Sequence, residues 1–172
     1  SSLHRREQSQ QGRFEHATTH PSQWPDFRVF LESVLNVPVF PYADTLSSIN
    51  INYYEKGLQL GWHYDNASFA ITLMVQAAEE GGEFEYLEKV RNQEAGEQGY
   101  TDTEAVIKGS LKPKKLKMGE GALVLFRGRN SLHRVAPVAS ERARILVTLN
   151  FNTEPGVMLS ELARMTFFGR IG

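Results

Sequence analysis

The stretch 142–151, RARILVTLNF, alternates between apolar and mostly polar residues along its whole length. On an extended chain, successive side chains point to opposite faces, so this period of two predicts a β-strand with one apolar face. The two predicted faces are Ala143, Ile145, Val147, Leu149 and Phe151 on one side, and Arg142, Arg144, Leu146, Thr148 and Asn150 on the other.

Other parts of the chain extend this pattern into a mainly β fold. Residues 48–54 (SININYY) and 68–76 (SFAITLMVQ) alternate in the same way, and shorter strands are expected at 82–86 and 121–127. Apolar residues recur at helical spacing over 27–35, and a final helix is expected over about 158–168. A helix, a run of strands and a helix predict an antiparallel sandwich or barrel with helices packed outside it.

The polar faces of these strands have two explanations. They could face water, which is the usual reason for alternation in an antiparallel sheet. They could instead line a barrel interior that holds a ligand, with the apolar faces packed beneath the helices.

The length and composition indicate one soluble domain. The chain has 172 residues, 41% of them hydrophobic and 23% charged, with a net charge of -1. We expect an irregular extension over 1–20 and a single domain over 21–172, in which the charged stretch 87–119 is an insertion and a candidate lid. One short helix is expected near 103–108.

The same composition excludes several classes of function. The chain contains no cysteine, so a metal here would need nitrogen and oxygen ligands. The balanced charge gives no reason to expect a nucleic-acid partner. No apolar run is long enough to cross a bilayer, and we expect a cytoplasmic protein.

Two histidines and one aspartate form a candidate metal site. His63 and Asp65 are two residues apart, so on an extended chain their side chains reach the same side. His133 lies on a later segment expected to be a strand. Two imidazoles and one carboxylate leave three coordination positions open, as in the facial triad of non-haem Fe(II) oxygenases.

Arg142 follows His133 by nine residues, at the start of the next predicted strand. Its guanidinium could form a bidentate pair with a carboxylate deeper in the barrel. The alternative is a surface arginine, because Glu141, Arg142 and Arg144 form a run of charge.

Four motifs resemble the Fe(II)/2-oxoglutarate oxygenase superfamily, in particular its prolyl-hydroxylase-like and AlkB-like branches. They occur in matching order over about 46–152, and they are Asn52-Tyr53-Tyr54-Glu55-Lys56-Gly57, Gly61-Trp62-His63-Tyr64-Asp65-Asn66, Gly81-Gly82-Glu83-Phe84, and His133 to Val138 with Glu141-Arg142. The resemblance implies a double-stranded β-helix, or jelly roll, that uses Fe(II), 2-oxoglutarate and dioxygen and releases succinate and carbon dioxide.

The resemblance also implies roles for individual residues. His63, Asp65 and His133 would be the catalytic iron ligands, and Arg142 would bind the distal carboxylate of 2-oxoglutarate. Further cosubstrate contacts would come from Tyr54, Asn52 and Gln76. Arg144 could exchange roles with Arg142, bind an acidic group of the substrate, or be exposed.

Two departures from the family patterns bear on the reaction. AlkB-like demethylases carry a second arginine six residues after the first, where this chain has Thr148. The aliphatic halogenases of the superfamily lack the carboxylate ligand, which leaves room for chloride. Because Asp65 is present, hydroxylation or a related oxidation is favoured.

The substrate is less defined by the sequence. Trp62, Ser68, Arg127 and Arg129 are the candidate substrate contacts, and the arginines suggest a small, amino-acid-like or carboxylate-bearing molecule. The arginines could equally belong to a solvated turn. Three classes remain open: a small-molecule hydroxylase, a hydroxylase or demethylase of a protein or nucleic acid, and a non-catalytic metal-binding jelly roll.

Overall fold

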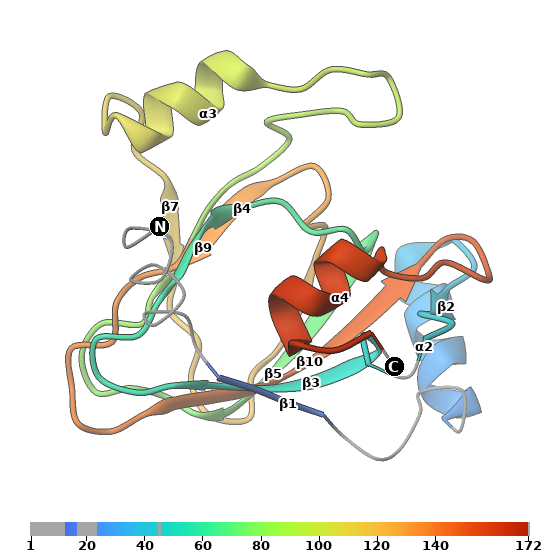
Figure 1. Ribbon diagram of the computed structural model, residues 1–172, viewed down its shortest axis with the longest axis horizontal. Coiled ribbons are helices and arrows are strands. Elements are labelled where there is room, and N and C mark those ends of the chain that lie inside the picture. The colour runs from blue at the N-terminus through green and yellow to red at the C-terminus, as the bar shows by residue number, and fades with distance from the viewer. Residues whose placement is uncertain (1–12, 17–23, 45, 172) are drawn as a thin grey trace.

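The computed structural model describes residues 13–16, 24–44 and 46–171, and it contains two antiparallel sheets that face each other (Figure 1). The six-stranded sheet has the order β1-β3-β10-β5-β8, with β2 paired to β10, and the four-stranded sheet has the order β4-β9-β6-β7. The strands are β1 Arg13–His16, β2 Phe40–Pro41, β3 Ile49–Tyr54, β4 Leu60–His63, β5 Phe69–Gln76, β6 Phe84–Leu87, β7 Lys114–Leu116, β8 Leu123–Phe126, β9 Leu132–Val135 and β10 Arg144–Asn152. Two facing antiparallel sheets with crossovers between strands confirm the mainly β jelly-roll prediction.

The long strands of the six-stranded sheet show what their alternation means. One face of β3, β5 and β10 contributes Ile49, Ile71, Leu149 and Phe151 to a buried apolar core. The opposite face lines a cavity between the sheets, through Asn50, Asn52 and Tyr54 of β3, Ala70 and Thr72 of β5, and Arg144, Leu146, Thr148 and Asn150 of β10. The polar faces therefore look into the barrel interior.

Helix α2, Pro25–Leu35, covers the outer face of the six-stranded sheet. Leu31 is fully buried against Ile71 and Phe151, which explains the helical recurrence of apolar residues. Pro25 occupies the first turn, and Asn36 ends the helix in the left-handed conformation, two residues before Pro38.

Helix α3, Tyr100–Ile107, belongs to the insertion and begins three residues before the predicted 103–108. It lies beyond β4 and β9, on the side of the molecule away from β1 and β3 (Figure 1). Val106 of the helix packs with Val90 and with Leu132 of β9. The insertion is therefore joined to the four-stranded sheet by an apolar cluster of its own.

Helix α4, Glu161–Phe168, starts three residues later than predicted because Ser160 caps it. The Ser160 hydroxyl accepts a hydrogen bond from the backbone N–H of Ala163 at 3.2 Å, and Gly169 ends the helix with a φ of 68°. Among the described residues, none of the helices has the length and apolar character that a membrane span requires.

The N-terminal stretch departs from the prediction in one place. Residues 1–20 were expected to be irregular, yet Arg13–His16 form β1 and pair antiparallel with β3. The cause is that an edge strand is held by backbone hydrogen bonds, which an alternation pattern does not report. The remainder of this stretch, 1–12 and 17–20, lies outside the described residues.

Candidate metal centre

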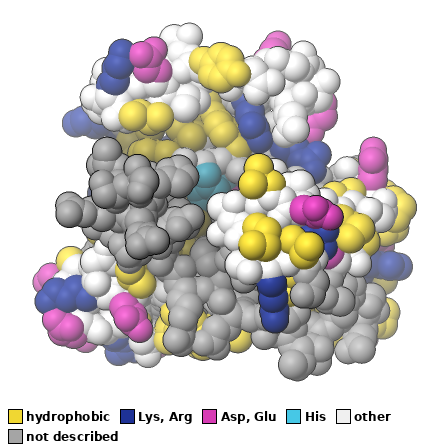
Figure 2. Space-filling model, viewed as in Figure 1, with side chains coloured by type: hydrophobic (Ala, Val, Ile, Leu, Met, Phe, Trp, Pro, Cys, Tyr) yellow, Lys and Arg dark blue, Asp and Glu magenta, His cyan; other side chains and the backbone are white. Residues whose placement is uncertain are grey.

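A cavity of about 180 Å³ lies between the two sheets. The four-stranded sheet and the loop after β4 supply His63, Asp65 and His133 to its lining, and the six-stranded sheet supplies Arg144 and a set of amides and hydroxyls. The His63 side chain is 28% exposed, so this end of the cavity reaches solvent. Figure 2 shows a histidine side chain at the surface in the middle of the face drawn. The cavity thus combines a candidate metal-ligating group with polar groups from the opposite sheet.

The predicted triad comes together. His63 at the end of β4 lies directly opposite His133 of β9, with ring centroids 4.1 Å apart. Asp65 Oδ1 is 3.5 Å from His63 Nε2 and 3.3 Å from His133 Nε2. One ligand atom from each residue lies within 4.8 Å of the other two, which is a spacing that a single metal ion can bridge.

A bulge places the two histidines opposite each other. Leu60 pairs with Val135 and His63 pairs with His133, so three steps along β4 correspond to two steps along β9. Such a bulge changes the direction in which a side chain points, and bulges are frequent beside active sites.

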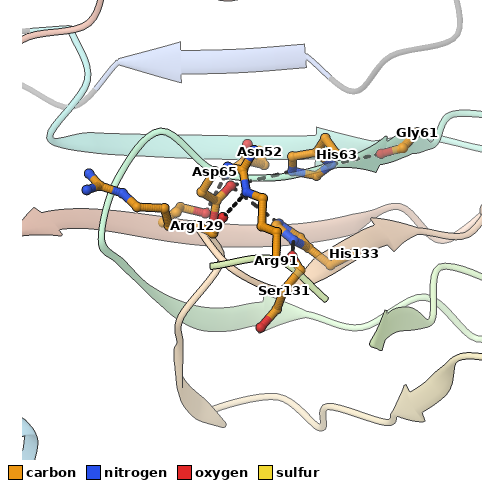
Figure 3. Close-up of polar contacts among 9 residues, drawn as sticks. Asn52, Gly61, His63, Asp65, Arg91, Arg129, Ser131 and His133 are labelled. Carbon is orange, nitrogen blue, oxygen red and sulfur yellow. Dashed lines mark hydrogen bonds and ion pairs between the residues drawn. The ribbon is translucent and has the colours of Figure 1, made fainter. Parts of the chain in front are cut away.

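The backbone orients both imidazole rings. Nδ1 of His63 lies 2.8 Å from the Gly61 carbonyl oxygen, and Nδ1 of His133 lies 2.9 Å from the Ser131 carbonyl oxygen. A carbonyl can only accept, so each Nδ1 carries a proton and each Nε2 is directed at Asp65. Figure 3 shows both rings turned toward Asp65. In the metal-free site Nε2 faces the carboxylate as a donor, and without its proton it would be the ring atom that binds a metal.

The electrostatics of the site keep Asp65 ionised. Burial alone would raise the pKa of Asp65, but hydrogen bonds and charge from His133 and His63 outweigh it and lower this pKa well below its usual range. Burial would lower the pKa of His63, and the Asp65 carboxylate reverses this and raises it. The carboxylate therefore offers a negative charge to a cation placed between it and the two rings.

Arg144, not Arg142, lies in the cavity. Arg144 is 2% exposed and lies over the Tyr54 ring at 5.5 Å, and its Nη1 has no hydrogen-bond partner among the described residues. Arg142 is on the surface, where its Nη2 pairs with Glu120 Oε1 at 2.6 Å. The expectation that Arg142 lines the barrel is corrected, because β10 begins only at Arg144 and the alternation does not extend back to residue 142.

The other predicted cosubstrate contacts are divided between the cavity and its exterior. Tyr54 and Asn52 are buried and line the cavity, and Asn52 donates a hydrogen bond to Thr148 Oγ1 at 2.9 Å. Burial raises the pKa of Tyr54 to about 12, so its hydroxyl stays protonated and can donate. Gln76 does not line the cavity, because its amide donates to the Ala143 carbonyl at 2.8 Å at the far end of β5.

None of the four predicted substrate contacts lines the cavity. The Trp62 ring lies under the Arg134 guanidinium at 4.8 Å, and the backbone N–H of Ser68 donates to Asn152. Arg127 is exposed above the Phe69 ring. Arg129 lies beside Asp65 and donates to the Asn66 carbonyl at 2.7 Å, with its guanidinium directed away from the histidines (Figure 3).

The structure adds two residues that the sequence did not single out, Arg91 and Thr103, as partners of Tyr64. Arg91 of the insertion stacks on the Tyr64 ring at 4.0 Å, and its Nε donates to the Arg129 carbonyl at 2.6 Å. The Tyr64 hydroxyl is 2.8 Å from Thr103 Oγ1 of α3. Tyr64 lies between His63 and Asp65 in the sequence, and this position was the one feature of the sequence that could have pointed to it. Its partners lie 27 and 39 positions away, beyond the reach of a local pattern.

Comparisons with known proteins agree with this architecture. A family model described as Halogenase D matches residues 3–164 of the chain. No curated protein matches the chain. Among solved structures, the chain is similar to a 2OG-Fe(II) oxygenase family oxidoreductase from Burkholderia pseudomallei, with 15% identity and a TM-score of 0.54 over 76% of this chain and 52% of that one.

Two further structures have the same fold. AviO1 from Streptomyces viridochromogenes Tue57 is 14% identical, with a TM-score of 0.58 over 79% of this chain and 60% of that one. HygX from Streptomyces hygroscopicus, solved with iron bound, is 13% identical, with a TM-score of 0.55 over 92% of this chain and 78% of that one. The chain therefore spans between 52% and 60% of the length of the first two structures.

Proposed function

The chain belongs to the Halogenase D family and to the Fe(II)/2-oxoglutarate oxygenase superfamily, and from this membership we propose that it is a 2-oxoglutarate-dependent hydroxylase. Its substrate would be a small, amino-acid-like or carboxylate-bearing molecule. The observation that carries the proposal is the group formed by His63, Asp65 and His133, whose ligand atoms lie within 4.8 Å of one another.

The donor set fits ferrous iron. Two neutral imidazoles and a carboxylate suit this ion, and they leave three positions for other ligands. When bound, the iron supplies the oxidation of a C–H bond coupled to decarboxylation of 2-oxoglutarate. The protein holds the imidazoles in the required tautomer through the Gly61 and Ser131 carbonyls.

Arg144 is our candidate for binding the distal carboxylate of 2-oxoglutarate. A buried guanidinium with an unpartnered N–H is costly unless an anion joins it, so the environment of Arg144 supports a carboxylate partner. Tyr54 lies against Arg144 and can donate a hydrogen bond to the same carboxylate. Both residues face the cavity from the sheet opposite the metal ligands, which suits an elongated cosubstrate.

Asp65 supports hydroxylation over halogenation, although the family is named for a halogenase. A halide bound to the iron would need the position that this carboxylate occupies. In products formed with saturating chloride or bromide, mass spectrometry should find an added oxygen and no halogen. A halogenated product from the unaltered protein would contradict the proposed reaction.

None of the predicted substrate contacts lines the cavity, and the Arg129 guanidinium is directed away from the histidines (Figure 3). The carboxylate-bearing substrate class therefore has to be tested directly. Succinate release screened over carboxylate-bearing and matched uncharged compounds would test this class.

The proposed function is tested first by anaerobic absorption spectroscopy. Metal-free protein mixed with Fe(II) and 2-oxoglutarate should show a weak visible charge-transfer band that requires both additions. The band should be lost in His63→Ala and retained in Trp62→Phe, a matched change at the neighbouring position. Absence of both the band and bound iron in the unaltered protein would favour a non-catalytic jelly roll.

A further inference from the structure

Gly128 lies on the loop between β8 and β9 and is buried against the Asp65 side chain. A Cβ atom built on Gly128 would lie 1.7 Å from Asp65 Oδ2, 2.4 Å from its Cγ and 2.9 Å from its Cβ. Its φ is outside the left-handed region, so the backbone conformation does not require glycine here. Glycine is required because there is no space for a side chain next to the Asp65 carboxylate.

The two oxygens of Asp65 have different surroundings. Oδ1 faces the imidazole Nε2 atoms of His63 and His133, whereas Oδ2 points into the space left by the missing side chain at Gly128. The backbone N–H of Asp65 donates to the Gly128 carbonyl at 3.1 Å, and Arg129 donates to the Asn66 carbonyl at 2.7 Å. The two loops are thus held together on both sides of the carboxylate.

We propose that Gly128 is a positioning residue, which reserves the volume that lets Asp65 turn one oxygen toward both histidines. The inference rests on the proposed metal site, but the contact between the two residues exists without a metal. It explains why the carboxylate ligand requires a glycine 63 positions further along the chain. The identity of residue 128 would then determine whether the site offers three protein ligands or two.

The crowding is too severe for a local adjustment. Rotation about the Asp65 side-chain bonds could move Oδ2 and Cγ away from a new methyl group, but it would turn the carboxylate away from the histidines. The 2.9 Å approach to Asp65 Cβ can be relieved only by separating the backbones, which the hydrogen bond between Asp65 and Gly128 opposes. Gly119 is a matched control, since a Cβ there meets no described atom within 4 Å.

The first test is a thermodynamic cycle on metal-free protein, measured by thermal unfolding. Gly128→Ala should lower the Tm by about 5 °C, and Gly119→Ala should leave it unchanged. In an Asp65→Gly background, which vacates the space, Gly128→Ala should cost almost nothing. In an Asp65→Asn background, which keeps the shape and removes the charge, its full cost should return. An equal cost in the Gly and Asn backgrounds would overturn the proposal.

The second test measures binding of Co(II), an oxidation-stable probe, from its visible spectrum below the Tm of every variant. Gly128→Ala should weaken binding by roughly 10- to 100-fold, as expected when a group that orients a ligand is changed. The same substitution in the Asp65→Gly background should leave the remaining affinity unchanged. Unaltered Co(II) affinity in Gly128→Ala would overturn the proposal. Failure of the unaltered protein to bind metal would refute the proposed function, while the metal-free cycle would still decide the role of Gly128.

Discussion

The two sheets contribute to the same cavity in different ways. The six-stranded sheet supplies Arg144, Asn52 and Tyr54 from strands of six and nine residues that pair with each other in a regular ladder, while β10 and β5 have one register shift at Ile145/Leu146. The four-stranded sheet supplies His63 and His133 from strands of four residues with a bulge between them, and Asp65 lies beyond the end of β4. Long strands provide the scaffold, and short ones present the candidate metal ligands.

This difference implies that stability and chemistry reside largely on opposite sides of the cavity. The apolar core that contains Leu31 and Ile71 lies behind the six-stranded sheet, under α2. Changes to the four-stranded sheet should therefore affect metal binding most, and changes behind the six-stranded sheet should affect folding most. Four substitutions, taken from the largest expected effect to the smallest, test this division.

Replacing His133 with alanine should have the largest effect. Loss of one of three ligands is expected to reduce turnover at least 1000-fold, which corresponds to about 4 kcal/mol. Succinate release and bound iron should fall together, and circular dichroism should show a folded protein. Full turnover in this variant would show that His133 of the four-stranded sheet is not needed for the proposed reaction.

Ile71→Ala should destabilise the protein by about 3 kcal/mol, because Ile71 is fully buried in the core under α2 and its removal leaves a cavity. Val75→Ala, on the same strand, is the control, since Val75 is 51% exposed and should cost less than about 1 kcal/mol. Urea unfolding measures both. Similar losses for the two variants would show that α2 does not define the core of this sheet.

Arg144→Ala should weaken 2-oxoglutarate binding roughly 30-fold, or about 2 kcal/mol, through loss of a charge-assisted hydrogen-bonded pair. Arg142→Ala should leave it nearly unchanged, because that guanidinium pairs with Glu120 outside the cavity. Anaerobic titration of the charge-transfer band gives both affinities. A larger loss of 2-oxoglutarate affinity in Arg142→Ala than in Arg144→Ala would show that Arg142 binds the cosubstrate.

Tyr64→Phe should have the smallest effect, about 1 kcal/mol of stability, because it removes the hydrogen bond to Thr103 and keeps the ring under Arg91. Thr103→Val removes the same bond from the insertion side. Unfolding of both single variants and the double variant should give less than additive losses. Strict additivity would mean that α3 and the ligand-bearing segment are not coupled through this bond.

The sequence predicted the two sides of the cavity unequally. Alternation located β3, β5 and β10 to within about two residues, because each strand has a continuous apolar face against one core. It could not locate the first residue of β10, since Arg142 and Arg144 are chemically identical and only the start of the ladder separates them. For this reason the sequence analysis expected Arg142 to point into the barrel, where the structure places Arg144.

The candidate metal site was predicted from residue spacing and not from alternation. The spacing of His63 and Asp65 and the later His133 suggested their proximity, and the structure brings them together. The role of Gly128 could not be predicted from the sequence, because a single glycine in a turn has many ordinary explanations. The contact of Asp65 with Gly128 and that of Tyr64 with Arg91 both depend on how distant loops pack, which no local pattern encodes.

The bulge in β4 has a consequence for how the chain tolerates changes in length. Without it, the pairing of Leu60 with Val135 would continue to place His63 opposite Leu132, whose side chain points to the other side of the sheet. Inserting one further residue between Leu60 and Gly61, beyond the one that the bulge accommodates, would have the same result. It would keep every candidate ligand in the sequence and still separate them in space. In this protein, a motif search on such an insertion variant would find an intact site that the fold could no longer assemble.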